Sequence, residues 1–348
     1  MNERQGAFRR CAAAVCTGVL LLFASAAPVQ AAGEQTETAP RRTVTELVPV
    51  GRAVGVKLFS DGVLVVGLSD GHSAAKDSGL REGDIMLTFN GTEIESTEQL
   101  QQLIAENGEA KASMGVRRGG AVLTMAVEPR EDEDGVCRLG AWIRDSMAGI
   151  GTMTFYDPES GVFGALGHGV TDVDTGELMP LSSGSIMNAS VKAVRRGESG
   201  SVGELRGDFD LDHDCGSLYA NTECGIFGTL DAQDAAYVSG KALPVARRGE
   251  VHCGNATVLV NCSGTEVEEY AIEIERLYDD SAPSRNLLLR VTDERLLEKT
   301  GGIVPGMSGS VILQDGKIVG AVTHVLLHQP ARGYGILIEN MLDAAGLA

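Results

Sequence analysis

The sequence is poor in aromatic residues and in positive charge. Phe, Trp and Tyr make up 4% of its 348 residues, whereas glycine occurs 45 times, a balance that favours short strands and turns over long packed helices. Only 29 Lys and Arg residues oppose 48 Asp and Glu, so the net charge is -19. An acidic chain without a basic stripe offers no surface for a phosphate backbone, and nucleic acid is not an expected partner. We expect a mainly β protein.

Long apolar runs are also scarce, and the clearest one lies at the N-terminus. Three arginines within the first ten residues precede the apolar stretch 11–27, and small residues follow it. This layout predicts a signal peptide or membrane anchor over residues 1–32, and the polar residues 33–42 predict a linker. The rest of the chain is therefore expected to cross a membrane, and to be membrane-associated until the N-terminal part is removed.

Beyond the N-terminal segment, cysteine is rare and odd in number. An odd count in an exported protein leaves at least one thiol unpaired, although two disulfides are possible. His213 and His252 each lie beside a cysteine and admit a zinc site, but the cysteine spacing does not match the usual close pairs. The sequence alone therefore predicts no metal and no other cofactor. The five cysteines are Cys137, Cys215, Cys224, Cys253 and Cys262.

Residues 43–130 carry the motifs of a first domain. The phrases Ser73-Ala74-Ala75, Gly79-Leu80-Arg81-Glu82-Gly83-Asp84-Ile85 and Asn90-Gly91 resemble a PDZ domain of the bacterial protease type. Such domains add an extended peptide to a sheet edge and bind its terminal carboxylate with backbone N–H groups. The ligand would be a peptide or the protein's own N-terminal segment; the alternative is a purely structural spacer. The resemblance implies that the carboxylate loop is formed by Val54, Gly55, Val56 and Lys57.

A second domain is predicted over residues 136–348, after the acidic linker 131–135. Its short apolar segments alternate with Gly and Asp turns, which favours a β-barrel or a pair of barrels. Near its end, Gly306-Met307-Ser308-Gly309-Ser310 precedes two apolar runs joined by Asp315-Gly316, a type I′ hairpin signal. The two glycines allow a sharp turn that directs N–H groups into one space, as a nucleophile with an oxyanion hole requires.

The same G-x-S-G-S pattern occurs at Ser199, but within a charged stretch that predicts only a loop. A serine nucleophile at Ser308 needs a base, and His168 is the best candidate because it lies between two glycines at the end of an apolar run. His324 follows a predicted strand and is interpreted as a strand-end residue. The remaining histidines lie in turns, in an apparent loop or beside cysteines: His72, His213, His252 and His328.

The motifs occur together in the order seen in the stage IV sporulation protein B peptidases, and the resemblance covers nearly the whole mature chain. They are Gly167-His168-Gly169-Val170, Gly225-Ile226-Phe227-Gly228-Thr229-Leu230, Lys241-Ala242-Leu243-Pro244-Val245-Ala246, Val291-Thr292-Asp293 and the Ser308 loop. The resemblance implies a serine endopeptidase with a chymotrypsin-like double β-barrel, secreted from the forespore into the space between its membranes. Such an enzyme cuts a membrane-bound regulatory protein, triggers sigma factor processing and cuts itself, here within Gln30–Thr45. One departure is Val311, where the family usually has proline.

By the same resemblance, His168 is the general base, Ser308 the nucleophile and Asp293 the third member of the triad. The oxyanion donors would be the N–H groups of Gly306 and Ser308, and the strand Ala321–His324 would pair with the substrate. Asp293 has a second interpretation, because an Asp before an apparent helix is a natural N-cap.

Asp208, Asp210 and Asp212 are competing acids, because the acid usually comes earlier in the chain of a double-barrel protease. The alternative for the whole protein is a catalytically silent barrel whose PDZ domain recruits a partner.

Overall fold

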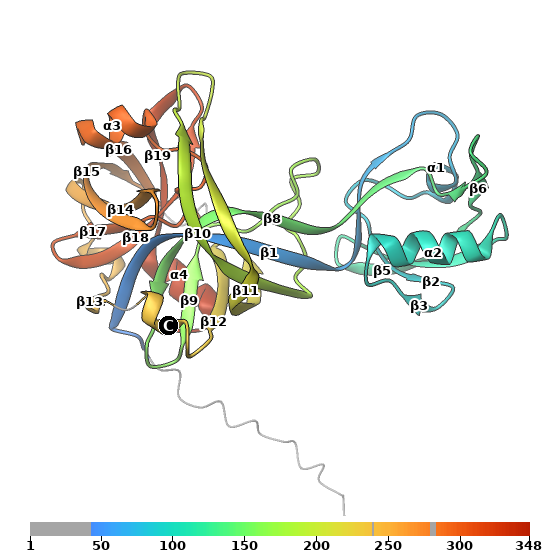
Figure 1. Ribbon diagram of the computed structural model, residues 1–348, viewed down its shortest axis with the longest axis horizontal. Coiled ribbons are helices and arrows are strands. Elements are labelled where there is room, and N and C mark those ends of the chain that lie inside the picture. The colour runs from blue at the N-terminus through green and yellow to red at the C-terminus, as the bar shows by residue number, and fades with distance from the viewer. Residues whose placement is uncertain (1–42, 239, 279–282) are drawn as a thin grey trace, which may run out of the picture. The chain divides into compact units, whose positions relative to one another are not determined.

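The computed structural model describes residues 43–238, 240–278 and 283–348. The predicted signal or anchor (1–32) and linker (33–42) lie outside these residues. Within the described part, no helix is both long and apolar enough to cross a membrane. Most described residues are in strands, so the expectation of a mainly β protein is confirmed (Figure 1).

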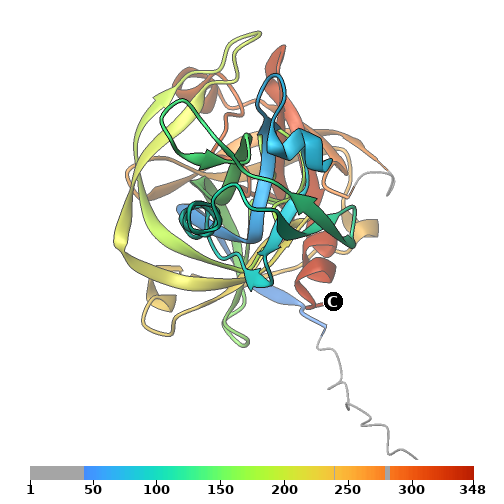
Figure 2. The same ribbon diagram turned by 90° about the vertical axis from the view of Figure 1, so that its right-hand side faces the viewer.

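The first barrel contains six antiparallel strands. They follow one another in the order β10-β11-β12-β9-β8-β1, and β10 also pairs with β1, which closes the ring. Figure 2 shows β10 and β11 curving together along one side. The strands are β1 (Glu46–Leu68), β8 (Ala141–Tyr156), β9 (Val162–Ala165), β10 (Ser183–Arg195), β11 (Glu204–Thr222) and β12 (Gly225–Leu230).

The second barrel is a closed ring in the order β14-β15-β16-β19-β18-β17. The turn between β17 and β18 has positive φ at both Asp315 (52°) and Gly316 (74°), as a type I′ turn requires. The predicted double barrel is thus present. Its elements are β14 (Gly254–Ser263), β15 (Glu266–Leu277), β16 (Leu287–Val291), α3 (Glu294–Thr300), β17 (Val311–Gln314), β18 (Lys317–Leu326), β19 (Gln329–Leu337) and α4 (Ile338–Ala345).

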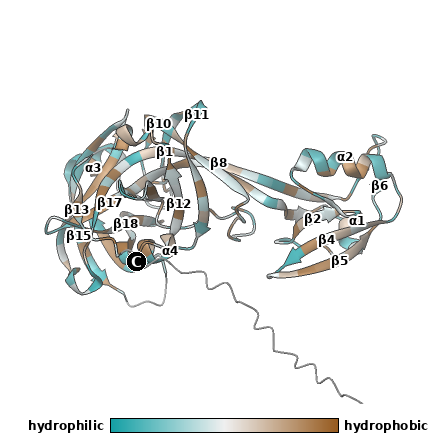
Figure 3. Ribbon diagram, turned by 90° about the horizontal axis from the view of Figure 1, so that it is seen from below, coloured by the Kyte–Doolittle hydropathy of each residue, from teal (hydrophilic) through white to brown (hydrophobic). Residues whose placement is uncertain are grey.

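The PDZ fold is inserted between β1 and β8. Ser73 caps α1 and Ser96 caps α2, each accepting a backbone N–H, so local polar signals start both helices. The helix α2 is largely hydrophilic (Figure 3) and buries Leu100 and Ile104 against the PDZ core. The elements are α1 (Ala74–Ser78), β2 (Ile85–Phe89), β3 (Thr92–Glu93), α2 (Thr97–Asn107), β4 (Ala112–Arg118) and β5 (Ala121–Val127).

Five short elements complete the described chain. The pair β6–β7 follows the PDZ strands, and β13 pairs with the start of β1. They are β6 (Arg130–Glu131), β7 (Cys137–Arg138), β13 (Leu243–Pro244) and the 3₁₀ helices η1 (Ala235–Val238) and η2 (Arg248–Glu250).

The predicted start of the PDZ domain and its carboxylate loop need correction. Residues 54–57 lie inside β1, where β10 pairs with one edge and β8 with the other, so they form no loop with free N–H groups. Gly55 is instead required by packing, since a Cβ there would lie 2.6 Å from the Phe209 ring. The first half of β1 is therefore part of the first barrel. The incorrect carboxylate-loop residues are Val54, Gly55, Val56 and Lys57.

Candidate active site

His168 and Ser308 line the same cavity, which has a volume of about 490 Å³. Each barrel contributes one of them: His168 follows β9 of the first, and Ser308 lies between α3 and β17 of the second. Most of the remaining lining is apolar and also comes from both barrels, for example Ile150 and Leu166 from the first and Val304 from the second. The structure therefore brings together the predicted base and nucleophile.

Three hydrogen bonds from β8 hold the Ser308 loop. The Thr152 N–H donates to the Ser308 carbonyl (2.9 Å), and its hydroxyl donates to the Gly306 carbonyl (2.8 Å). The Thr154 hydroxyl donates to the Gly309 carbonyl (2.9 Å). Both threonines are buried, so water does not compete for these carbonyls. The loop's carbonyls point toward the first barrel as a result.

The same loop leaves two N–H groups available at the cavity. Met307 and Gly309 use their N–H groups on Val304 and Val322, whereas within the described residues the N–H groups of Gly306 and Ser308 donate to no acceptor. Gly306 and Gly309 have φ of +99° and +97°, a region that side chains disfavour. Two free donors on a fixed, sharply turned loop are what an oxyanion requires.

The Ser308 hydroxyl donates to the Thr323 carbonyl at 2.8 Å. Thr323 belongs to β18. The two residues before it are already paired on both sides: Ala321 with β17, Val322 with the Ser308 loop, and both with β19. Of the predicted substrate-pairing stretch Ala321–His324, Thr323 and His324 line the cavity, together with Val325. The part of β18 that substrate can reach is therefore 323–325.

A strained turn presents His168. Leu166, a non-glycine residue, and Gly167 both have φ of +68°, a combination found where surrounding packing imposes the backbone path. The His168 Nδ1 lies 2.8 Å from the Gly169 carbonyl oxygen. Since a carbonyl only accepts, Nδ1 carries the proton and Nε2 is the basic nitrogen. Burial lowers the pKa of His168 below its ordinary value near 6.5, so the ring is neutral at pH 7 and Nε2 is free to accept a proton.

His324 is the site residue whose position the sequence did not reveal. Its ring centroid lies 5.2 Å from that of His168, and its buried Nδ1 has no hydrogen-bond partner within the described residues. Burial, reinforced by His168 and Arg285, lowers the pKa of His324 to about 4. In the sequence, His324 follows an apolar stretch that predicts a strand, and this pattern does not indicate a contact with the His168 ring.

The predicted role of Asp293 needs correction. Its carboxylate accepts the Arg295 N–H at the start of α3 (3.0 Å) and the Ala271 N–H (3.2 Å), and it pairs with the Arg295 side chain. Arg295 is the main reason that the pKa of Asp293 falls to about 2. Asp293 does not line the His168 cavity, so it is the N-cap of α3, the second interpretation that the sequence offered.

The competing acids are also separate from His168. Asp208, Asp210 and Asp212 lie exposed on β11, and Asp208 faces Lys192. Within the described residues, the Gly169 carbonyl is the hydrogen-bond partner of the His168 ring in the place where an acid was expected. The second G-x-S-G-S copy is a loop, as predicted: the Ser199 hydroxyl donates to the His328 carbonyl.

Two antiparallel barrels with a serine and a histidine at a shared cavity define a chymotrypsin-like serine endopeptidase, here carrying a PDZ domain. The family model of the SpoIVB peptidase S55 matches residues 135–342, and that of the PDZ domain matches residues 65–118. The first match covers more than half of the chain, which therefore belongs to the SpoIVB peptidase S55 family. The resemblance stated from the sequence motifs is thereby confirmed, and the enzyme is favoured over the silent barrel.

The search of curated proteins found no significant relative. Among solved structures, the chain is similar to the PDZ domain of the SdrC-like protein from Listeria monocytogenes. The two share 20% identity, and the match covers 24% of this chain and 87% of that chain, with a TM-score of 0.22.

The lowered histidine pKa values predict that stability falls in mild acid. Between pH 6.5 and about 4 the unfolded chain binds protons on His168 and His324 that the folded chain resists. The stability that the folded chain gains from keeping these two histidines neutral is complete above pH 6.5 and is lost as the pH falls. We expect the Tm of His324→Gln to decrease less over this range than that of the unsubstituted chain.

Thermal unfolding from pH 7 to 4 measures this effect, with His72→Gln as the control because the His72 side chain is 93% exposed. The same pH dependence for His324→Gln and the unsubstituted chain would contradict the prediction.

Proposed function

We propose that this endopeptidase uses Ser308 as nucleophile and His168 as general base. The observation that carries this assignment is the single cavity lined by both residues and by Gly306, next to the free N–H groups of Gly306 and Ser308. In the first step, the serine proton passes to His168 Nε2, the nitrogen that the Gly169 carbonyl leaves unprotonated. The serine oxygen attacks the peptide carbonyl, and the two N–H groups stabilise the resulting oxyanion.

The Ser308 hydroxyl has to leave the Thr323 carbonyl before this transfer, because in the structure it donates its hydrogen bond to that carbonyl. Catalytic hydrogen bonds often align only when substrate is bound. A substrate strand alongside 323–325 would compete for the backbone of β18 at this point. The apolar lining of the cavity favours a substrate with an apolar side chain near the bond that is cut.

Ser308→Ala and His168→Ala are each expected to lower peptide hydrolysis by on the order of 10⁴- to 10⁶-fold, because nucleophile and base act as a unit. Labelling of the intact protein with a serine-directed fluorophosphonate should disappear in Ser308→Ala.

The matched control is Asp293→Ala. As a lost helix cap, it should lower stability by about 0.5–2 kcal/mol and leave the hydrolysis rate within a few-fold of normal. Labelling that persists in Ser308→Ala would remove the nucleophile assignment, and a loss of rate in Asp293→Ala comparable to that of His168→Ala would restore the acid role.

The PDZ domain is proposed to bind peptides at the loop before β8. Between 141 and 147, β8 pairs with β1 on one edge, and its other edge has no strand partner among the described residues. Leu139 and Gly140 use their carbonyls on Ala75 and Ser69, whereas their N–H groups donate to no described group. Gly140 has φ of +74°, as a tight carboxylate-binding turn permits.

A fluorescent peptide with a free C-terminal carboxylate should therefore bind the Ser308→Ala protein, and its C-terminal amide should bind at least about tenfold more weakly, since a charge-assisted hydrogen bond is lost. Fluorescence anisotropy with both peptides measures the difference. Equal affinity for acid and amide would exclude a carboxylate site at this loop.

We further propose that the protein acts in sporulation, exported from the forespore into the space between its membranes and held at the membrane until it is processed. Family membership and the predicted N-terminal signal or anchor support this proposal. The substrate would be a membrane-bound regulatory protein whose cleavage triggers sigma factor processing. Cleavage of the protein's own N-terminal part would release the catalytic part.

The self-cleavage site is expected between Gln30 and Thr43. Val44 is only 2% exposed and β1 begins at Glu46, so a cut beyond Thr43 would remove part of the core. N-terminal sequencing should show this shorter form for the active protein and a longer form for Ser308→Ala made in the same cells. Identical termini would mean that another protease makes the cut.

A further inference from the structure

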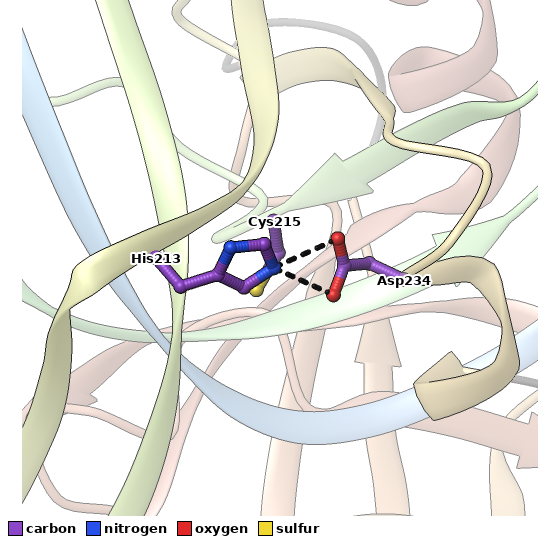
Figure 4. A group of neighbouring side chains, drawn as sticks. All are labelled: His213, Cys215 and Asp234. Carbon is purple, nitrogen blue, oxygen red and sulfur yellow. Dashed lines mark hydrogen bonds and ion pairs between the residues drawn. The ribbon is translucent and has the colours of Figure 1, made fainter.

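A histidine, a cysteine and an aspartate converge in the first barrel outside the active-site cavity. His213 and Cys215 lie two residues apart on β11, and Asp234 lies in the turn between β12 and η1 (Figure 4). Among the described residues this is the one group of three such side chains close enough to share a cation. The fold places Asp234 there through the Asp231 N–H, which donates to the Cys215 carbonyl at 3.0 Å.

The distances suit a small divalent cation. His213 Nε2 lies 3.0 Å from each Asp234 carboxylate oxygen, and the three potential ligand atoms are all within 4.8 Å of one another. A tetrahedral zinc ion binds N, O and S at about 2.0–2.3 Å, which sets its ligands roughly 3.3–3.8 Å apart. Closing the group around zinc therefore needs side-chain shifts of only about 1 Å.

The surroundings of the three side chains also favour a site that holds a cation. Cys215 and Asp234 are buried, at 5% and 3% exposure, while His213 is partly open to solvent and leaves access for an ion. The nearby carboxylates of Asp210 and Asp231 add negative charge that a cation would offset.

We propose that His213, Cys215 and Asp234 bind one zinc ion, which replaces the proton between His213 and Asp234. The mixed N, S and O ligands favour zinc over magnesium or calcium, which prefer oxygen alone. The site ties an irregular part of the barrel together. The pairing of β10 with β11 steps from Met187–Asp214 to Ala189–Phe209, so residues 210–213 lie outside the regular ladder. Zinc would fix this bulge to the turn after β12.

The test uses the full chain carrying Ser308→Ala, treated with a chelator and then titrated with zinc or cobalt(II). We expect one ion per chain, a thiolate-to-cobalt charge-transfer band, and a Tm that rises with zinc because only the folded state holds the three ligands together. Cys215→Ser should abolish the charge-transfer band. His213→Gln and Asp234→Asn should each weaken zinc binding at least ~10-fold, since even indirect contacts to a metal are worth 10–100-fold.

A matched control exists in the second barrel. His252 lies next to Cys253 and 2.9 Å from Asp315, but all three side chains are exposed. His252→Gln and Cys253→Ser should therefore leave zinc binding unchanged. If Cys215→Ser fails to fold, His213→Gln decides the question, because its side chain is partly exposed. The absence of stoichiometric binding, or binding that His213→Gln does not weaken, would show that the group is only an ion pair beside a buried thiol.

Discussion

The attachment of the Ser308 loop to β8 is the constraint on which the site depends. Ser308, the proposed nucleophile, belongs to the second barrel and His168, the proposed base, to the first, so neither barrel alone fixes the position of one relative to the other. Thr152 and Thr154 fix this relative position with three hydrogen bonds to carbonyls of the loop. A buried carbonyl left without its donor costs about 1–3 kcal/mol, so the loop has little freedom to leave this position. Gly309 makes the approach possible, since a Cβ there would lie 1.9 Å from the Thr152 carbonyl oxygen.

The meeting of His168 and Ser308 at one cavity could be predicted because the signals of both residues are local. Glycines beside His168 and Ser308 predict sharp turns, and Gly306 with Gly309 indicates where N–H groups converge. The partner of the His168 ring could not be predicted in this way, because an Asp that caps a helix and an Asp that orients a histidine look alike in sequence. The structure distinguishes them by contact: Asp293 bonds to Arg295 and Ala271, whereas His168 Nδ1 bonds to the Gly169 carbonyl.

The wrong prediction of a carboxylate loop at residues 54–57 has a different physical cause. Helix caps such as Ser73 and Ser96 mark elements of the PDZ domain, and such short-range signals are visible in the sequence. Which strand pairs with which is a long-range property, and the sequence does not show that β1 runs for 23 residues through two folds. Partners almost 100 residues away in β8, and further still in β10, decide whether the stretch is a loop or a central strand. The convergence of Asp234 with His213 and Cys215 depends on the same kind of pairing.

The long strand β8 shows how the insertion leaves the catalytic barrel intact. Its first residues, 141–144, complete the PDZ sheet beside β1, and its later residues include Thr152 and Thr154, which hold the Ser308 loop. Between them the β1–β8 ladder is interrupted, with Phe59 and Leu64 of β1 opposite Ser146 and Arg144 of β8. A regular ladder would transmit any change of register along the whole strand, whereas an irregularity absorbs it. A peptide on the open edge of β8, as proposed for the PDZ domain, would therefore leave the pairing that fixes Thr152 unchanged.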